Sequence, residues 1–228
     1  MEVFNSIPVD LETNEVLKSM RMHGGNQQVE RMVQELVEVT RSIAKPKVVY
    51  KVSYVDDKDG DTVTIDGVRF TSRLLRINLD QVERVFPYIA TCGTELEEVA
   101  IPSKDIMKSF CFDAIKTIVL RLAVDYVSNR LIEYYALGKM SHMNPGSLES
   151  WPITQQKELF SLFGNAEELI GVRLTKSCVM FPLKSVSGIY FPTEIEFASC
   201  QLCLREKCIG RRAPYDPELA KKYREGTV

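Results

Sequence analysis

The sequence predicts an α+β protein with a long central helix and an N-terminal helical annex. Residues 104–136 carry an apolar stripe at helical spacing that is long enough for a central helix. Short segments between residues 46 and 93 are rich in β-branched residues and alternate between apolar and polar side chains, as strands do. The first 45 residues hold two further segments with helical spacing. We therefore divide the chain into a helical annex (1–45), an α+β core (46–199) and a cysteine-rich C-terminal extension (200–228).

The N-terminal part of the chain predicts two helices followed by strands. A glycine pair at residues 24–25 separates the two helices. Their apolar positions are Val16, Leu17 and Met20 in the first helix, and Val29, Met32, Val33, Leu36 and Val37 in the second. Strands are predicted over residues 46–55, 62–65 and 84–93, with an aspartate-rich turn at 56–61 between the first two.

The C-terminal half begins with the long helix and ends with a short one. The stripe of the long helix is formed by Ile106, Phe110, Ala114, Ile118, Leu122, Tyr126 and Leu131. Residues 141–152 contain a Pro-Gly pair and are too many for a simple turn, so we predict a functional loop. A short helix over 153–164 ends at Gly164. Residues 170–182 and 187–200 predict two strands of an antiparallel hairpin, and 216–226 a polar helix.

Composition disfavours several classes of function. The formal net charge of -2 provides no basic excess for binding nucleic acid. No apolar run approaches the roughly 18–20 residues that a membrane span needs. The N-terminus lacks the basic and then apolar pattern of a signal peptide, so we expect a cytoplasmic protein. In that reducing compartment the six cysteines are expected to be thiols, metal ligands or redox groups rather than disulfides.

One stretch of the chain carries a specific family pattern, whereas the standard motifs for phosphate binding, zinc proteases and serine hydrolases are absent from the sequence. The pattern lies between residues 143 and 191. It consists of Pro145–Gly146, Ile170–Gly171, Leu174–Thr175, Ser177, Met180, Pro182 and Ser185–Val186–Ser187–Gly188, in fixed order. On these residues the chain resembles the activation domain of cobalamin-dependent methionine synthase. Upstream, the segment IATCGTELEEV and the long helix resemble the stand-alone forms of that domain.

The resemblance implies a fold and a function. The fold is a twisted antiparallel sheet with a long central helix, and the domain binds S-adenosylmethionine in a shallow site beside the Pro-Gly loop. Its function is the reductive reactivation of an oxidised corrinoid, in which the cobalt receives one electron and a methyl group. Since the chain shows no corrinoid-binding module, the cobalamin is expected on a separate partner, such as a methionine synthase that lacks its own activation domain. A flavodoxin or ferredoxin would supply the electron. Whether the chain itself counts as an enzyme is left open.

The resemblance also implies the residues that bind S-adenosylmethionine. They are His142, Asn144, Pro145, Gly146, Ser147, Ser187 and Phe197. Glycine allows a ligand to approach the backbone, and proline fixes the shape of the loop. Two positions depart from the family pattern, because His142 stands where the family has arginine and Ser147 where it has tyrosine. A neutral imidazole does not replace a guanidinium that holds a carboxylate, so another group, for example Arg121, is expected to do so.

Three cysteines, Cys200, Cys203 and Cys208, lie within nine residues of the extension. Thiolates at this spacing favour an iron–sulfur cluster or zinc, and the basic residues around them favour thiolates. If residues 182 and 188 pair in a hairpin, Cys178 lies roughly 26 Å from Cys200 along the second strand, which disfavours it as the fourth ligand. Unmetallated thiols remain the alternative for this segment.

Two other functions stay open. The chain could be a non-catalytic corrinoid-protein chaperone or an S-adenosylmethionine-binding module that has lost the chemistry together with the arginine. It could also be a structural module held together by zinc or an iron–sulfur cluster. For the Pro-Gly loop, the alternative is a turn without a ligand, because such dipeptides are common in turns. Ser185 and Ser187 have an alternative role in the turn of the hairpin.

Overall fold

A computed structural model describes residues 1–22, 26–193, 198–208, 211 and 213–225 of the chain. The helices are α1 (Thr13–Ser19), α2 (Gln27–Ile43), α3 (Arg73–Asn78), α4 (Ile106–Tyr134), α5 (Gln156–Ser161), α6 (Ala166–Ile170) and α7 (Pro217–Glu225). Three short 3-10 helices are η1 (Glu95–Glu97), η2 (Ile153–Gln155) and η3 (Ser199–Leu202). The strands are β1 (Glu2–Phe4), β2 (Lys47–Tyr50), β3 (Ser53–Asp59), β4 (Thr62–Ile65), β5 (Val68–Thr71), β6 (Arg84–Thr91), β7 (Met140–Met143), β8 (Arg173–Leu174), β9 (Met180–Phe181) and β10 (Ser185–Pro192).

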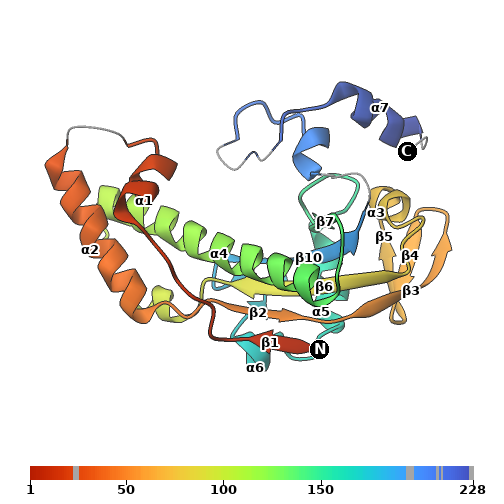
Figure 1. The fold of residues 1–228 in the computed structure, drawn as a ribbon, viewed down its shortest axis with the longest axis horizontal. Coiled ribbons are helices and arrows are strands. Elements are labelled where there is room, and N and C mark those ends of the chain that lie inside the picture. The colour runs from red at the N-terminus through yellow and green to blue at the C-terminus, as the bar shows by residue number, and fades with distance from the viewer. Residues whose placement is uncertain (23–25, 194–197, 209–210, 212, 226–228) are drawn as a thin grey trace.

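The main sheet is built around β6, and all of its described pairings are antiparallel. β2 and β3 lie end to end along one edge of β6. β10 pairs along the other edge and in turn pairs with β7. β1 extends the sheet beyond β2, and the β4–β5 hairpin extends it beyond β3. Figure 1 shows α4 running across one face of this sheet, with α1 and α2 at one end and α7 at the other.

The alternation of side chains along β6 produces two cores. Phe86, Tyr88 and Ala90 face the C-terminal half of α4 and pack against its buried stripe of Ala123, Val127 and Leu131. Val85 and Ile89 point to the opposite face. There they join a larger core formed with α3, α5, α6 and the loop that follows β7. The central strand is therefore buried on both faces, as its burial pattern shows.

The N-terminal half of α4 belongs to a third core. Cys111, Ile115 and Val119 pack there against apolar residues of α1 and α2, including Val16 and Val33. Asn26 caps α2, its side-chain oxygen accepting from the N–H groups of Gln28 and Val29. The predicted long helix and the predicted N-terminal helices are confirmed, as is the α+β fold with an antiparallel sheet. The exact division of the chain into three parts remains a prediction.

The predicted hairpin of residues 170–182 and 187–200 is wrong. β10 pairs with β6 and β7, whereas β8 and β9 are two-residue strands that pair only with each other among the described residues. Cys178 lies in the turn between them with a φ of 62°, so the premise used to measure its distance from Cys200 does not hold. Other boundaries differ as well, because the predicted strand 46–55 is two strands and the predicted aspartate-rich turn is mostly part of β3.

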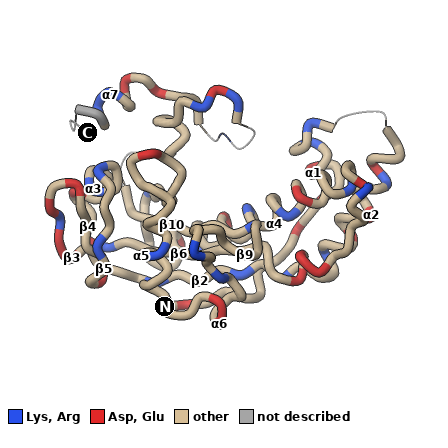
Figure 2. Tube along the Cα trace, turned by 180° about the vertical axis from the view of Figure 1, so that it is seen from behind, with Lys and Arg blue, Asp and Glu red and all other residues tan. Residues whose placement is uncertain are grey.

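Basic and acidic residues are mixed along the described chain. Figure 2 shows basic and acidic residues interspersed along much of the chain, with acidic residues near the end of β3. No helix among the described residues is both long and apolar enough to cross a membrane.

Candidate functional site

The loop that joins β7 to η2 is fixed to the sheet by Asn144. The side-chain Nδ2 of Asn144 donates to the backbone carbonyl of Ser187 at 2.8 Å and lies 2.9 Å from the hydroxyl oxygen of Tyr88. These contacts connect the Pro-Gly loop with β10 and with the central strand β6. The structure therefore brings together the two parts of the sequence, near residues 145 and 187, that carry the family resemblance.

The end of β7 and the residue after it approach β10 so closely that position 188 must be glycine. A Cβ atom at this position would lie 2.3 Å from Nδ2 of Asn144 and 2.5 Å from the carbonyl oxygen of Met143. Both distances are shorter than real Cβ contacts, so a side chain here would push the loop away from the strand. Gly188 is therefore required by the packing of the loop.

The Pro-Gly turn closes on itself. Gly146 has a φ of +81°, in the left-handed region that favours glycine, and its N–H donates to the carbonyl of Trp151 at 2.7 Å. The N–H groups of Ser147 and Trp151 also donate within the loop, to Asn144 and Leu148 respectively. These backbone groups are satisfied internally and are not available to a ligand.

The backbone N–H groups of the next three residues are not satisfied within the loop. Those of Leu148, Glu149 and Ser150 donate no hydrogen bond to any part of the chain that the structure describes. Glu149 and Ser150 are exposed, whereas Trp151 is fully buried and packs edge-on against Phe70. The buried indole thus holds the loop in place while the three residues before it present unpaired donors at the surface.

Two buried polar atoms lie at the base of this loop. Gln156, at the start of α5, lies with its Nε2 3.2 Å from the hydroxyl oxygen of Ser187, but its Oε1 has no hydrogen-bond partner in the described residues. The indole Nε1 of Trp151 likewise has none there. Buried polar atoms are nearly always paired, so a ligand or an ordered water is expected to satisfy them.

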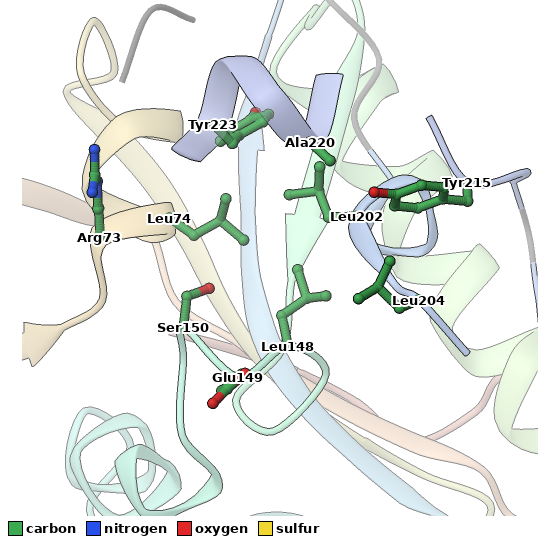
Figure 3. A pocket seen from close by; sticks show the side chains of 10 residues that line it. All are labelled: Arg73, Leu74, Leu148, Glu149, Ser150, Leu202, Leu204, Tyr215, Ala220 and Tyr223. Carbon is green, nitrogen blue, oxygen red and sulfur yellow. The ribbon is translucent and has the colours of Figure 1, made fainter. Parts of the chain in front are cut away.

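A pocket of about 470 Å³ lies beside the loop. Its volume is within the usual range for sites that bind small molecules. It lies between the loop, α3, η3 and α7, as Figure 3 shows. The lining residues are Arg73, Leu74, Leu148, Glu149, Ser150, Leu202, Leu204, Tyr215, Ala220 and Tyr223. The pocket is mostly apolar, with one cationic and one anionic side chain.

The C-terminal segment is docked on the core through Tyr223 of α7. This side chain is 8% exposed, and its hydroxyl donates to Oδ1 of Asn78 in α3 at 2.7 Å. Burial raises the pKa of Tyr223 to about 12. The segment therefore forms one wall of the pocket and α3 forms another.

Those residues predicted to bind S-adenosylmethionine that the structure describes do not line this pocket. Pro145 is buried, Gly146 and Ser147 are exposed, and the backbone of these residues shapes the loop. His142 lies in β7 opposite Tyr190, with the two rings 5.2 Å apart. The remaining position, Phe197, lies outside the described residues. Direct contact between these residues and a ligand stays a prediction.

The suggested substitute for the family arginine does not line the pocket. Arg121 is exposed on α4, far along the chain from the loop, and it is not among the residues that line the pocket. The guanidinium that does line the pocket is that of Arg73.

The three cysteines of the extension are not arranged as the ligands of a metal site. Cys200 and Cys203 are half-buried and Cys208 is exposed. In the described part of the chain, no group of three or more His, Cys, Asp or Glu residues is arranged so that it could hold a metal ion. The residues as placed therefore do not fit a three-cysteine iron–sulfur or zinc centre.

Arg211 organises this segment instead. Its guanidinium donates to the backbone carbonyls of Cys200 at 2.9 Å, Cys203 at 3.1 Å and Ala213 at 3.2 Å, and also to that of Arg205. One planar group with five donors thus satisfies four carbonyls that are spread over fourteen residues of chain. This role of Arg211 differs from the sequence-based prediction, in which the nearby positive charge stabilises the cysteine thiolates.

Comparison with known proteins identifies the class of fold. A crystal structure described as the MetH reactivation domain bound to AdoHcy matches with a TM-score of 0.57 at 16% sequence identity. The match covers 87% of this chain and 81% of that chain. The fold is therefore that of a reactivation domain.

The sequence comparison names the family that the central part resembles. The family model described as vitamin B12 dependent methionine synthase, activation domain, matches residues 146–201. This confirms the resemblance to the activation domain of cobalamin-dependent methionine synthase. No curated protein matches the chain. The matched range includes the loop from Gly146 to Trp151 and all of β10, and it ends inside η3.

Several residues of the pocket were not found from the sequence. Arg73, Leu202, Leu204 and Tyr215 come from segments on either side of the family pattern. Ser72 provides one local signal, since its hydroxyl accepts from the N–H of Leu75 at 3.1 Å and starts α3 at Arg73. A capping serine predicts where the helix begins, but not what its first residue faces.

Proposed function

We propose that this protein reactivates a corrinoid methyltransferase by binding S-adenosylmethionine and supporting methylation of cob(II) on a separate partner. The partner would be a corrinoid protein or a cobalamin-dependent methionine synthase that lacks its own activation domain. The observation that carries this proposal is the connection between Asn144 and Ser187. It joins the Pro-Gly loop to the strand that contains the Ser-Val-Ser-Gly run, both inside or at the edge of the family match.

The reaction needs three participants. The methyl–sulfonium bond of S-adenosylmethionine breaks and a cobalt–methyl bond forms on the partner's cofactor. One electron must come from a separate donor, such as a flavodoxin or ferredoxin, so that cob(II) becomes methylcobalamin and S-adenosylhomocysteine is released. A sulfonium is already a good leaving group, so the protein mainly has to position the methyl donor.

The loop is suited to this positioning role. Its shape is fixed by Pro145, by the internal hydrogen bond of Gly146 and by the buried indole of Trp151. The N–H groups of residues 148–150 then offer donors for the polar groups of the ligand. The family resemblance proposes a different set of contacts, at His142, Asn144, Pro145, Gly146, Ser147, Ser187 and Phe197, as the alternative to a ligand in the pocket. No step of the reaction is assigned to Cys200, Cys203 or Cys208.

The test is a single-turnover experiment with the full chain. The probe is a cobalamin-dependent methionine synthase without its activation domain, holding cob(II), in the presence of a reductant and S-adenosylmethionine with a labelled methyl group. We expect labelled methylcobalamin only when this protein is present. Formation of no methylcobalamin despite measured binding of S-adenosylmethionine would contradict the reactivation function.

A second function is supported by the position of His142. This residue stands at the family's arginine position, yet it lies in β7 against Tyr190. A chain without the guanidinium at that place could bind S-adenosylmethionine or a corrinoid protein without catalysing methyl transfer. Binding without methyl transfer in the same experiment would support this chaperone or sensor function.

A further inference from the structure

The pocket beside the loop has two chemically different ends. Figure 3 shows Arg73 at one end and Tyr215 at the other, with Leu148 and Leu202 between them. Ser150 lies nearer to Arg73, and Leu204 lies nearer to Tyr215. A ligand that spans such a pocket should carry an anionic group at one end and a flat ring at the other.

We infer that the pocket holds S-adenosylmethionine lengthwise, with Arg73 receiving its carboxylate and Tyr215 stacking against its adenine. This inference rests on the proposed function, since it concerns the same ligand. It assigns the carboxylate to a residue from α3 and the adenine to a residue from the C-terminal segment. Neither residue belongs to the part of the chain that the family model matches.

The charged end has the donors that a carboxylate needs. A guanidinium binds a carboxylate through two parallel hydrogen bonds. The unpaired N–H groups of Glu149 and Ser150 come from residues that line the same pocket. The helix start set by Ser72 fixes the backbone of Arg73, and Leu74, which follows it, is 5% exposed and anchored in the core. The cation is thus presented from a rigid element.

The other end offers an aromatic surface that is not used by the core. Tyr215 is 36% exposed and stacks on no other ring in the portion of the chain with described placement. Leu204 beside it is 76% exposed, although it lines the pocket. Such exposed apolar groups gain most from being covered by a flat, apolar face, and a base stacks favourably on an aromatic side chain.

Arg211 keeps this end in place. Its hydrogen bonds to the carbonyls of Cys203 and Ala213 join the two short stretches that carry Leu204 and Tyr215. The N–H of Asp216 also donates to the carbonyl of Gln201 at 2.9 Å. The described parts of this wall are therefore joined to one another by hydrogen bonds.

The experiment compares two ligands by calorimetry on the full chain. S-adenosylhomocysteine carries both the carboxylate and the adenine, whereas 5′-methylthioadenosine lacks the amino-acid end. We expect the wild-type protein to bind S-adenosylhomocysteine about tenfold to 100-fold more tightly, the range for hydrogen bonds to charged groups. The Arg73→Met variant should lose this preference and bind both ligands with the affinity of 5′-methylthioadenosine.

Matched variants separate binding from folding. Arg69→Met removes an exposed arginine of the neighbouring strand β5 that lies outside the pocket, and it should leave both affinities unchanged. Tyr215→Phe keeps the ring and should bind normally, whereas Tyr215→Ala should weaken both ligands about tenfold. If Arg73→Met does not fold, Arg73→Lys serves instead, because it keeps the charge without the planar fork and should give an intermediate preference.

The outcomes distinguish the two proposals. A wild-type protein that binds neither ligand overturns the proposed function itself. Binding with an unchanged preference in Arg73→Met, or an equal loss of both ligands, overturns the role of Arg73 alone. Full binding in Tyr215→Ala overturns the assignment of the adenine.

Discussion

The side-chain amide of Asn144 lies 2.8 Å from the backbone carbonyl of Ser187, to which it donates a hydrogen bond across 43 residues of sequence. Through this bond, a loop whose residues 146, 147, 149 and 150 are exposed is held against the buried strands β6 and β10. The geometry leaves no space for a side chain at the next position, Gly188. Several consequences of this arrangement can be measured.

The Gly188→Ala variant should be less stable than the wild type. Its Cβ would meet Nδ2 of Asn144 and the carbonyl oxygen of Met143, so we expect a loss of about 1–3 kcal/mol in the free energy of unfolding. Denaturant unfolding measures this loss. The matched control is Gly138→Ala, where a Cβ atom meets nothing within 4 Å and should change stability little. Equal effects of the two substitutions would contradict the close approach.

The fluorescence of Trp151 should report ligand binding. It is the single tryptophan of the chain, it is fully buried, and its carbonyl accepts the hydrogen bond that closes the Pro-Gly turn. A ligand that engages the loop should therefore change the emission in a saturable way, with the affinity found by calorimetry. In Trp151→Phe the signal should vanish. Tight binding to the wild type without any change in emission would separate the ligand from this loop.

Removal of the Arg211 side chain should loosen the C-terminal segment. Arg211→Ala leaves the carbonyls of Cys203, Arg205 and Ala213 without their donor and removes one of the two donors to that of Cys200, so we expect trypsin to cleave after Lys207 at least about tenfold faster. Lys222→Ala, which removes an exposed cation of α7, serves as the control and should cleave at the wild-type rate.

A chelator distinguishes Arg211 from a metal as the group that holds this segment. We expect EDTA to leave the cleavage rate of the wild-type protein unchanged. Faster cleavage with EDTA, equal to that of Arg211→Ala, would instead support the three-cysteine metal site that the sequence predicts. Metal analysis of anaerobically purified protein would then identify the ion.

The cysteines should differ sharply in reactivity. Burial raises the pKa of the Cys92 thiol from 9.0 to about 12, and burial also raises the pKa of Cys111. Since the thiolate is the reactive form, both should resist alkylation at pH 8, whereas Cys208 is exposed and should react quickly. Mass spectrometry after timed alkylation locates the labelled residues. All six should react in denaturant, and rapid labelling of Cys92 in the native protein would show that its burial is wrong.

The same raised pKa predicts an effect of alkaline pH on stability. The thiol of Cys92 keeps its proton in the folded protein up to about pH 12, whereas in the unfolded chain it loses the proton near pH 9.0. Its burial therefore contributes full stability below pH 9, and that contribution falls as the pH rises from 9 toward 12. Denaturant midpoints of the wild type and of Cys92→Ala, measured between pH 8 and pH 10.5, should converge as the pH rises. Parallel curves would contradict the shift.

The elements predicted best from the sequence are those whose local pattern of apolar and polar residues follows directly from their burial. The extent of α4 was predicted, because its residues keep a helical period over 29 residues. The predicted stripe is wrong along most of its length, since Ile106 and Phe110 are 78% and 51% exposed. The buried stripe runs instead through Cys111, Phe112, Ile115, Val119, Ala123, Val127 and Leu131. The strand β6 is apolar because both of its faces are buried. The predicted hairpin of residues 170–200 is wrong because the pairing of strands depends on the packing of the whole sheet. β10 finds two partners from distant segments, β6 and β7, which no local pattern indicates.

The candidate site, too, was predicted only where a local sequence pattern marks it. The Pro-Gly loop and the Ser-Val-Ser-Gly run were found because a family pattern marks them, and they do meet through Asn144. The pocket was not found, because its walls come from three segments that are brought together only by folding. For the cysteines, spacing indicated metal binding, but the guanidinium of Arg211 is bonded to the carbonyls of this segment.

The residues with which the C-terminal segment lines the pocket, Leu202, Leu204, Tyr215, Ala220 and Tyr223, all lie beyond the range that the family model matches, which ends at residue 201. One half of the pocket is thus encoded outside the matched range. Transplanting residues 199–225 onto another domain of this fold would carry Leu202, Leu204 and Tyr215 with it. Selectivity among adenosyl compounds could then be exchanged between proteins without altering the sheet that supports it.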